Sequence, residues 1–157
     1  MKREPSPTMR AIRQERPFRS LAQETLIALL LAAEHVRWPI QDALAAEGEL
    51  TLKQYNVMRI LRGAGETGLP TLAIGERMIA RTPGITRLLD RLEKKKLVQR
   101  ERSDTDRRQV VVRITRAGRE LLARLDPALD KLDDEILPLS QAELRTLLPL
   151  LERIHAG

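Results

Sequence analysis

Apolar residues recur every three or four positions along most of this chain, which is the spacing of one face of an α-helix. The longest pattern covers about residues 18–46 and contains the apolar run LIALLLAA at residues 26–33. Because this run is apolar nearly all round, we expect its helix to be buried on more than one side. A chain of 157 residues has little else to cover it with, so the pattern favours an interface with a second copy. Trp38-Pro39 should kink the helix.

Three shorter helical patterns follow. Thr51 and Gln54 form a capping-box pattern that opens a helix running to about Leu61. A second short helix covers residues 72–77. A third begins at Pro83, with Thr82 as its N-cap, and its apolar positions are Ile85, Leu88, Leu89 and Leu92. Two short helices joined by a tight turn, the second polar and basic on its outer face, predict a helix-turn-helix.

The pattern then changes to that of two strands, and afterwards returns to helix. Residues 98–102 and 109–115 can pair across the polar segment 103–108, which predicts a two-stranded wing. Thr115 is the expected N-cap of a helix with leucines at helical spacing up to Leu137, and Asp126-Pro127 should bend or restart it. Ser140 and Glu143 form a second capping box, and Pro149 should kink the last helix.

These elements predict a mainly α (α+β) fold, a winged helix-turn-helix with N- and C-terminal dimerisation helices. We assign residues 1–18 to a basic N-terminal arm, residues 19–48 and 117–157 to dimerisation helices, and residues 50–116 to the DNA-binding lobe. The proline-rich arm is either a solvated tail or a segment that touches phosphate or a partner subunit. The leucine stripes are core or dimer interface.

Charge points to a polyanionic partner. The chain has a net charge of +6, and residues 81–108 alone carry +5. With no cysteine, the chain has no disulfide framework, thiolate metal site or thiol switch. No apolar run is long enough to cross a membrane and the N-terminus is not signal-like, so we expect a cytoplasmic, soluble protein with no membrane partner.

Catalytic and cofactor motifs are absent from the sequence. Residues 63–68 (GAGETG) formally match G-x-G-x-x-G, but a dinucleotide loop must follow a strand and open a helix, whereas a helix precedes this one. The two histidines have no nearby nucleophile, and no H-E-x-x-H or P-loop occurs. We therefore expect no enzyme activity, no cofactor and no metal site.

At this point the sequence resembles a known family. Residues 50–58 (LTLKQYNVM), 85–95 (ITRLLDRLEKK), 104–108 (DTDRR) and 114–118 (ITRAG) together look like a MarR-type transcriptional regulator over about residues 20–155. The resemblance implies an obligate homodimer of winged helix-turn-helix protomers that binds pseudo-palindromic double-stranded DNA operators. Many members are repressors released by small organic effectors. The alternative function is a winged-helix module that docks a protein partner without specific DNA binding.

The family's functional positions transfer to particular residues. Thr86, Arg87 and Arg91 match positions that face the major groove, Arg108 matches the wing arginine that probes the minor groove, and Arg107 lies beside it. Asp106 either orients an arginine or forms a surface ion pair in the turn. Thr82 is a further DNA-binding candidate at the start of the recognition helix.

Three lysines follow the recognition helix. Lys94, Lys95 and Lys96 either bind phosphate or complement the helix dipole. The family usually has glycine at Lys96, so a left-handed conformation there costs about 1 kcal/mol. The effector is expected between the dimerisation helices and the lobe, where His35, Arg37, Trp38 and Tyr55 are candidates. Each of them is otherwise a packing residue, and His35 is alternatively a pH-sensitive interface contact.

Overall fold

The computed structural model describes residues 4–80, 83–102 and 109–156, and the chain forms two compact units, Met1–Pro39 and Ile40–Gly157. The first unit holds α1 (Pro7–Ala11), a helix that was not predicted within the basic arm, and most of α2 (Leu21–Gly48). Ser6 caps α1 by accepting a hydrogen bond from the backbone N–H of Met9. The helix predicted over about residues 18–46 is confirmed, and it continues without interruption through Pro39.

The part of α2 that belongs to the first unit has an apolar surface that this unit does not cover. None of the described residues of the first unit is buried, and Leu26 and Leu30 are 56% and 57% exposed. The sequence predicts burial on more than one side, and a single chain does not supply it. A dimer interface remains the prediction for this surface.

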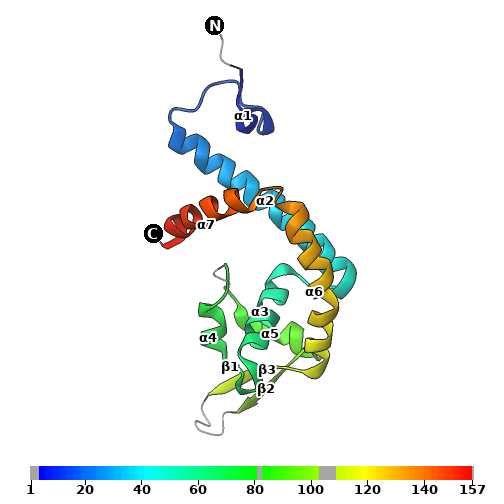
Figure 1. The fold of residues 1–157 in the computed structure, drawn as a ribbon. Coiled ribbons are helices and arrows are strands. Elements are labelled where there is room, and N and C mark those ends of the chain that lie inside the picture. Colours follow the sequence, from blue (N-terminus) through cyan, green and yellow to red (C-terminus); the bar gives the residue numbers. More distant parts are fainter. Residues whose placement is uncertain (1–3, 81–82, 103–108, 157) are drawn as a thin grey trace. The chain divides into compact units, whose positions relative to one another are not determined.

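The second unit contains the lobe. Its elements after α2 are α3 (Leu52–Gly63), the 3₁₀ turn η1 (Gly65–Thr67), β1 (Leu69–Pro70), α4 (Thr71–Glu76), α5 (Ile85–Lys94), β2 (Val98–Arg102), β3 (Val110–Ile114), α6 (Arg116–Ile136) and α7 (Gln141–Ala156). Figure 1 shows α3, α4 and α5 lying together beside the small sheet. This arrangement confirms the predicted winged helix-turn-helix, and the glycine-rich segment after α3 is a loop with a single 3₁₀ turn.

The sheet is antiparallel with strand order β1-β3-β2. The predicted hairpin is confirmed, with Val98 opposite Ile114 and Arg102 opposite Val110. The sequence did not predict β1, which pairs Leu69 and Pro70 with Val112 and Val111. Two residues carry no alternation pattern, and proline in a strand is tolerated at an edge such as this one.

The core of the lobe is an aliphatic cluster drawn from helices α2 to α6 and from the sheet. Its fully buried large side chains are Leu44, Leu50, Val57, Met58, Leu61, Ile74, Leu89, Leu92, Val98, Val112, Leu122 and Leu125. Because one stripe of each amphipathic helix points into this cluster, the opposite stripe is left at the surface.

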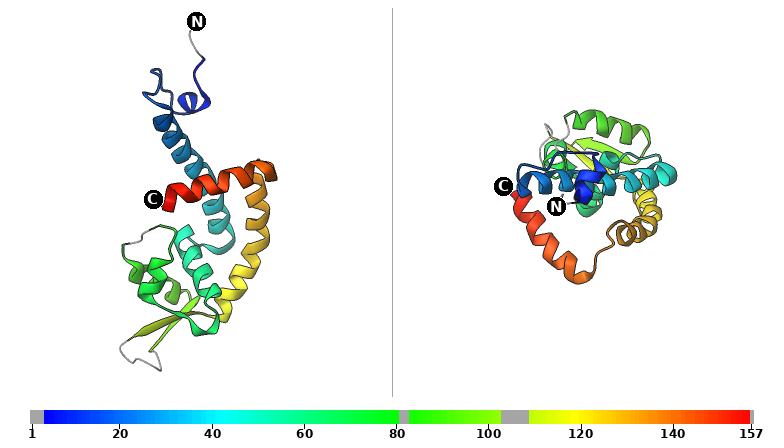
Figure 2. Two further views of the ribbon diagram at one scale, coloured as in Figure 1. Left: turned by 60° about the vertical axis from the view of Figure 1, so that its left-hand side comes forward. Right: turned by 90° about the horizontal axis from the view of Figure 1, so that it is seen from above.

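Most predicted helix boundaries are confirmed. Thr51 and Gln54 form the capping box at the start of α3, and Ser140 and Glu143 form the one at the start of α7. A restart at Pro127 is wrong, because α6 runs unbroken through that residue. Figure 2 shows α6, coloured yellow to orange, as one continuous helix. Likewise, α7 continues through Pro149.

Four elements meet at Thr115. Its Oγ1 accepts a hydrogen bond from the Gly118 backbone N–H (3.1 Å) and donates one to the carbonyl oxygen of Lys96 (2.8 Å), while its own N–H donates to the carbonyl of Leu97 (3.1 Å). Gly118 lies so close to this junction that an added Cβ would stand 2.3 Å from the Leu97 carbonyl oxygen. The T-x-x-G motif at residues 115–118 is therefore a joint between the end of α5, both wing strands and α6.

We expect Gly118→Ala to lower the free energy of unfolding by about 1–3 kcal/mol, because the methyl group meets backbone that cannot move aside easily. Gly75→Ala is the matched control, since Gly75 also lies in a helix but has open space around its Cβ position. It should gain up to about 1 kcal/mol from helix propensity. Urea unfolding of both variants measures this, and equal stability of the two would contradict the role of the close approach.

The cap of α7 has a pH dependence. The Ser140 hydroxyl and, to a smaller extent, its backbone N–H hydrogen-bond the carboxylate of Glu143 and lower the pKa of that group. A lowered folded-state pKa means that the cap stabilises α7 above the unfolded-state pKa and is lost as pH falls through the folded-state value. We expect an NMR titration to find the Glu143 pKa below its ordinary value and Ser140→Ala to raise it. Thr146→Ala, whose hydroxyl bonds the Ala142 carbonyl, should leave it unchanged.

Candidate nucleic-acid interface

Helix α5 separates an apolar face from a basic face. Leu89 and Leu92 are fully buried in the lobe, and Ile85 and Leu88 pack against them. The side chains of Thr86, Arg87, Arg91 and Lys94 are exposed, as the sequence predicts for a helix that reads DNA. Because the apolar stripe holds the helix in the core, the exposed arginines have a rigid backbone behind them.

The start of α5 differs from the prediction. The helix begins at Ile85 and its N-cap is Gly84, so Thr82 is not the N-cap and Pro83 is not the first helical residue. Gly84 has φ 82°, in the left-handed region that glycine adopts without a Cβ penalty. Thr82 itself lies outside the described residues, and its contact with DNA remains a prediction.

The three lysines at the end of α5 have different surroundings. Lys94 is exposed. The Lys95 ammonium donates to the carbonyl oxygen of Glu49 at 2.7 Å and lies 3.6 Å from its carboxylate, so it anchors the end of α5 to the end of α2. Lys96, where the family usually has glycine, adopts a left-handed conformation with φ 58°, and its N–H donates to the Glu93 carbonyl oxygen at 2.8 Å.

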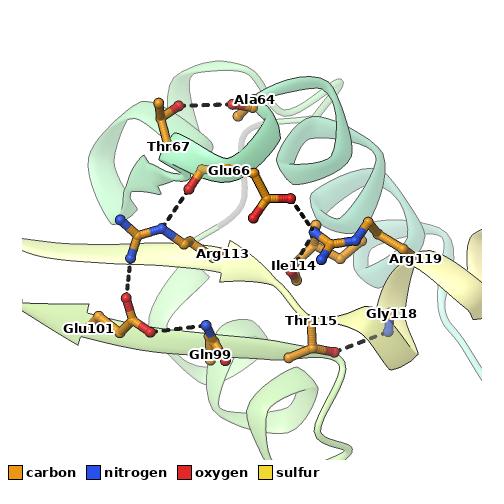
Figure 3. Close-up of polar contacts among 10 residues, drawn as sticks. All are labelled: Ala64, Glu66, Thr67, Gln99, Glu101, Arg113, Ile114, Thr115, Gly118 and Arg119. Carbon is orange, nitrogen blue, oxygen red and sulfur yellow. Dashed lines mark hydrogen bonds and ion pairs between the residues drawn. The ribbon is translucent and has the colours of Figure 1, made fainter.

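The base of the wing is tied to its surroundings by arginines. Figure 3 shows Arg113 of β3 paired with Glu101 of β2, while its Nε donates to the Glu66 carbonyl oxygen at 2.7 Å. The Glu66 carboxylate in turn lies 3.3 Å from Arg119 of α6. Arg100, on β2, pairs with Asp90 and Glu93 of α5. The predicted wing residues Asp106, Arg107 and Arg108 lie outside the described residues.

Arg100, Arg113 and Glu66 were not predicted as parts of the site. The sequence does place Arg100 and Arg113 in the two wing strands, and their alternation along those strands is a signal for the face that each one takes. Their acidic partners carry no such signal, because each pairing depends on how distant segments pack.

The effector candidates fall in both units and are described separately. In the first unit His35, Arg37 and Trp38 are exposed, and Arg37 forms an ion pair with Glu34 at 2.6 Å. In the second unit Tyr55 is half-buried, and its hydroxyl oxygen accepts a hydrogen bond from Arg59 at 2.9 Å. His35 was alternatively expected to be a packed, hydrogen-bonded residue, but in the single chain it is exposed.

An ion pair and a hollow are two further features of the lobe. Arg62 of α3 makes two hydrogen bonds to the carboxylate of Asp126 in α6, at 2.6 and 3.3 Å, which raises the pKa of the guanidinium. A hollow of about 720 Å³ lies beside α4 and the start of α5, between Leu72, Ile79 and Pro83. None of the four effector candidates lines this hollow.

Two features of other function classes are absent from the part of the chain that the structure describes. No helix there is long and apolar enough to cross a membrane. No group of three or more His, Asp or Glu side chains there is arranged to hold a metal ion.

Comparison with known proteins identifies the family. A family model described as transcriptional regulator SarA/Rot matches residues 40–125. The transcriptional regulator HosA of Escherichia coli O157:H7 is 33% identical over 105 residues, which cover 67% of this chain and 76% of that protein. A MarR transcription factor from Planctomyces limnophilus, known from its crystal structure, is 36% identical with a TM-score of 0.65, covering 87% of this chain and 98% of that one.

A DNA complex shares the fold. Sco3205, a MarR family transcriptional regulator from Streptomyces coelicolor crystallised in complex with DNA, is 20% identical with a TM-score of 0.78, covering 91% of this chain and 92% of that one. The proteins of this family are transcriptional regulators and not enzymes. The matched residues, the relatives and the basic winged helix-turn-helix together show that the chain belongs to the SarA/Rot family of MarR-type transcriptional regulators.

Proposed function

We propose that this chain is a cytoplasmic, homodimeric repressor that binds a pseudo-palindromic DNA operator and is released from it by a small organic effector. The observation that carries the proposal is the exposed stripe of Thr86, Arg87, Arg91 and Lys94 on a helix whose other side is buried in the core. An α-helix with such a stripe fits the major groove of B-DNA.

The side chains of this stripe differ in the part of the DNA that each is expected to contact. Arg87 and Arg91 are one helical turn apart, and each can present a guanidinium fork to the O6 and N7 acceptors of a guanine. Lys94 offers a single ammonium to phosphate, which adds affinity without sequence preference. Lys95 is already engaged with Glu49, which favours Lys94 as the phosphate contact. Arg107 and Arg108, with Asp106 as orienting group, remain the proposed minor-groove contacts of the wing.

Two copies of the recognition helix are needed for a palindromic site. The exposed leucines of α2 and of α7, among them Leu30 and Leu148 at 57% and 58% exposure, support an interface made by the terminal helices. Burying them would supply the hydrophobic gain that a stable dimer requires. The two α5 helices would then enter successive major grooves about one helical turn apart.

Release by an effector is a separate part of the proposal. His35, Arg37, Trp38 and Tyr55 remain the candidate contacts. With a single Trp, Tyr and Phe in the chain, the pocket would be mainly aliphatic with a few polar groups. Screening small organic compounds for release of the protein from its operator tests this part separately.

We expect Arg87→Ala and Arg91→Ala each to lose about 1–3 kcal/mol of operator binding and to relax the base preference at one position, since each removes a bidentate base contact. Lys94→Ala should weaken binding to all duplexes alike and reduce the slope of log K against log salt by about 0.9. Lys131→Ala, which removes the same charge from an i,i+4 pair on α6, is the control.

The measurement is fluorescence anisotropy on a duplex that the wild-type protein has selected from a random pool, beside a scrambled duplex. Selection of no sequence, or equal affinity of wild type for both duplexes, would contradict operator recognition and leave the protein-docking module as the function. A Lys131→Ala variant that behaves like Lys94→Ala would show that only net charge matters.

Dimerisation has its own test. We expect Leu30→Glu or Leu148→Glu to make the protein sediment as a single chain at concentrations where the wild type sediments as two, because a carboxylate would have to be buried in the interface. Leu72→Glu is the matched control, since Leu72 is 75% exposed but lies on α4 of the lobe. Analytical ultracentrifugation distinguishes these cases, and dimeric Leu30→Glu and Leu148→Glu proteins would refute the assigned interface.

A further inference from the structure

Arg100 makes an unusual set of contacts for a residue of the wing. It lies on β2, and its side chain is only 23% exposed. Its Nη1 is 2.6 Å from the Asp90 Oδ1 and 3.5 Å from the Glu93 Oε2, and its Nη2 donates to the carbonyl oxygen of Thr86 at 3.1 Å. The backbone N–H of Arg100 also donates to Glu93 Oε1 at 3.2 Å. One residue of the wing thus holds three residues of α5.

The three partners form a single stripe along α5. Residues 86, 90 and 93 are spaced i, i+4 and i+7, so they lie above one another on the helix surface. This stripe runs between the buried apolar stripe of Leu89 and Leu92 and the exposed stripe of Arg87 and Arg91. A polar contact at the edge of the buried face adds a directional constraint on rotation of α5 about its own axis to the one that the apolar packing already supplies.

We propose that Arg100 is a positioning residue for operator recognition, which fixes the rotation of α5 against the wing so that Arg87 and Arg91 meet the base edges together. This rests on the proposed function, because it concerns the same recognition helix. Arg100 itself touches no base or phosphate, because its guanidinium is occupied by the carboxylates of α5.

The energetics of the contact favour positioning over a role in holding the fold together. Asp90 and Glu93 are 45% and 41% exposed, and ion pairs of such groups contribute little to global stability. Breaking them should therefore leave the lobe folded. Base recognition by a guanidinium fork, in contrast, depends on direction, so a small rotation of α5 costs affinity for the operator and hardly affects binding to unspecific DNA.

The variant Asp90→Asn distinguishes positioning of α5 from a simple effect of charge on DNA affinity. Asp90→Asn removes a negative charge beside the DNA-binding stripe, and by charge alone it should strengthen binding to every duplex. If Asp90 serves to hold Arg100, the same change should weaken binding to the operator while binding to scrambled DNA stays equal or rises. The two expectations have opposite signs.

The experiment compares wild type, Arg100→Gln, Asp90→Asn, their double variant and Arg100→Lys on the selected duplex and on the scrambled one, over a range of salt concentrations. The matched control is Arg102→Gln, which makes the same change two residue pairs further along β2, at an exposed position. Thermal unfolding monitored by circular dichroism accompanies each variant. The wild-type measurement tests the proposed function by itself. The variants can report on positioning only if the wild type prefers the selected duplex.

We expect Arg100→Gln and Asp90→Asn each to lose roughly tenfold on the selected duplex and much less on the scrambled one, with an unchanged salt slope. The double variant should be no worse than either single variant, because both break one contact. Arg100→Lys should recover part of the loss, since it keeps the charge but not the fork.

Three results would overturn the proposal. Equal loss on both duplexes with a slope smaller by about 0.9 would make Arg100 a phosphate contact. Tighter operator binding by Asp90→Asn would show that its charge, and not its bond to Arg100, matters. Full operator affinity in Arg100→Gln would make the contact dispensable. If Arg100→Gln fails to fold, Asp90→Asn still decides between these outcomes.

Discussion

The burial of one stripe of α5 in the aliphatic core is the constraint on which the rest of the structure depends. Leu89 and Leu92 are fully buried in an aliphatic cluster to which α3, α4, the sheet and α6 also contribute. A helix held in this way has its opposite side fixed in space, and on this side the chain places arginines. The charge of the interface is thus presented by a surface whose position is decided by packing.

The wing extends this arrangement through polar contacts on both faces of its strands. Arg100 reaches from β2 to α5, and Arg113 reaches from β3 to the turn after α3. The hairpin is therefore attached to two different parts of the lobe, and each attachment uses a charged side chain that alternation along the strand directs to the appropriate face. Two neighbouring strands with arginines on opposite faces make the base of the wing a rigid part of the lobe.

Local signals were sufficient to predict most elements from the sequence. Thr51 with Gln54, Ser140 with Glu143 and Thr115 each mark a helix start by chemistry contained within four residues, and the structure confirms all three. The helical period alone likewise separates Leu89 and Leu92 from the exposed Arg87 and Arg91. The left-handed Lys96, in contrast, was suggested by the family's usual glycine at this position and not by a local pattern.

The features that the sequence analysis predicted wrongly or did not predict have two physical causes, one local and one tertiary. The start of α5 was wrong because Pro83 and Gly84 compete, and the positive φ of Gly84 ends the turn two residues later than the proline rule suggests. The strand β1 exists only because Val111 and Val112 pair with it. The partners of Arg100, Lys95 and Arg113 are chosen by the packing of distant segments. The strand β1 and these side-chain pairings depend on tertiary structure, which no local pattern contains.

The junction at Thr115 has a consequence for how the wing can vary. A strand that slips by one residue turns every side chain to the other face, so a hairpin normally relies on its turn to hold the pairing in place. Here the hydrogen bonds of Thr115 to Lys96, Leu97 and Gly118 hold the pairing from the opposite end, where the strands join α5 and α6. The alignment of β2 with β3 is therefore fixed at the base of the wing, whatever sequence joins their other ends.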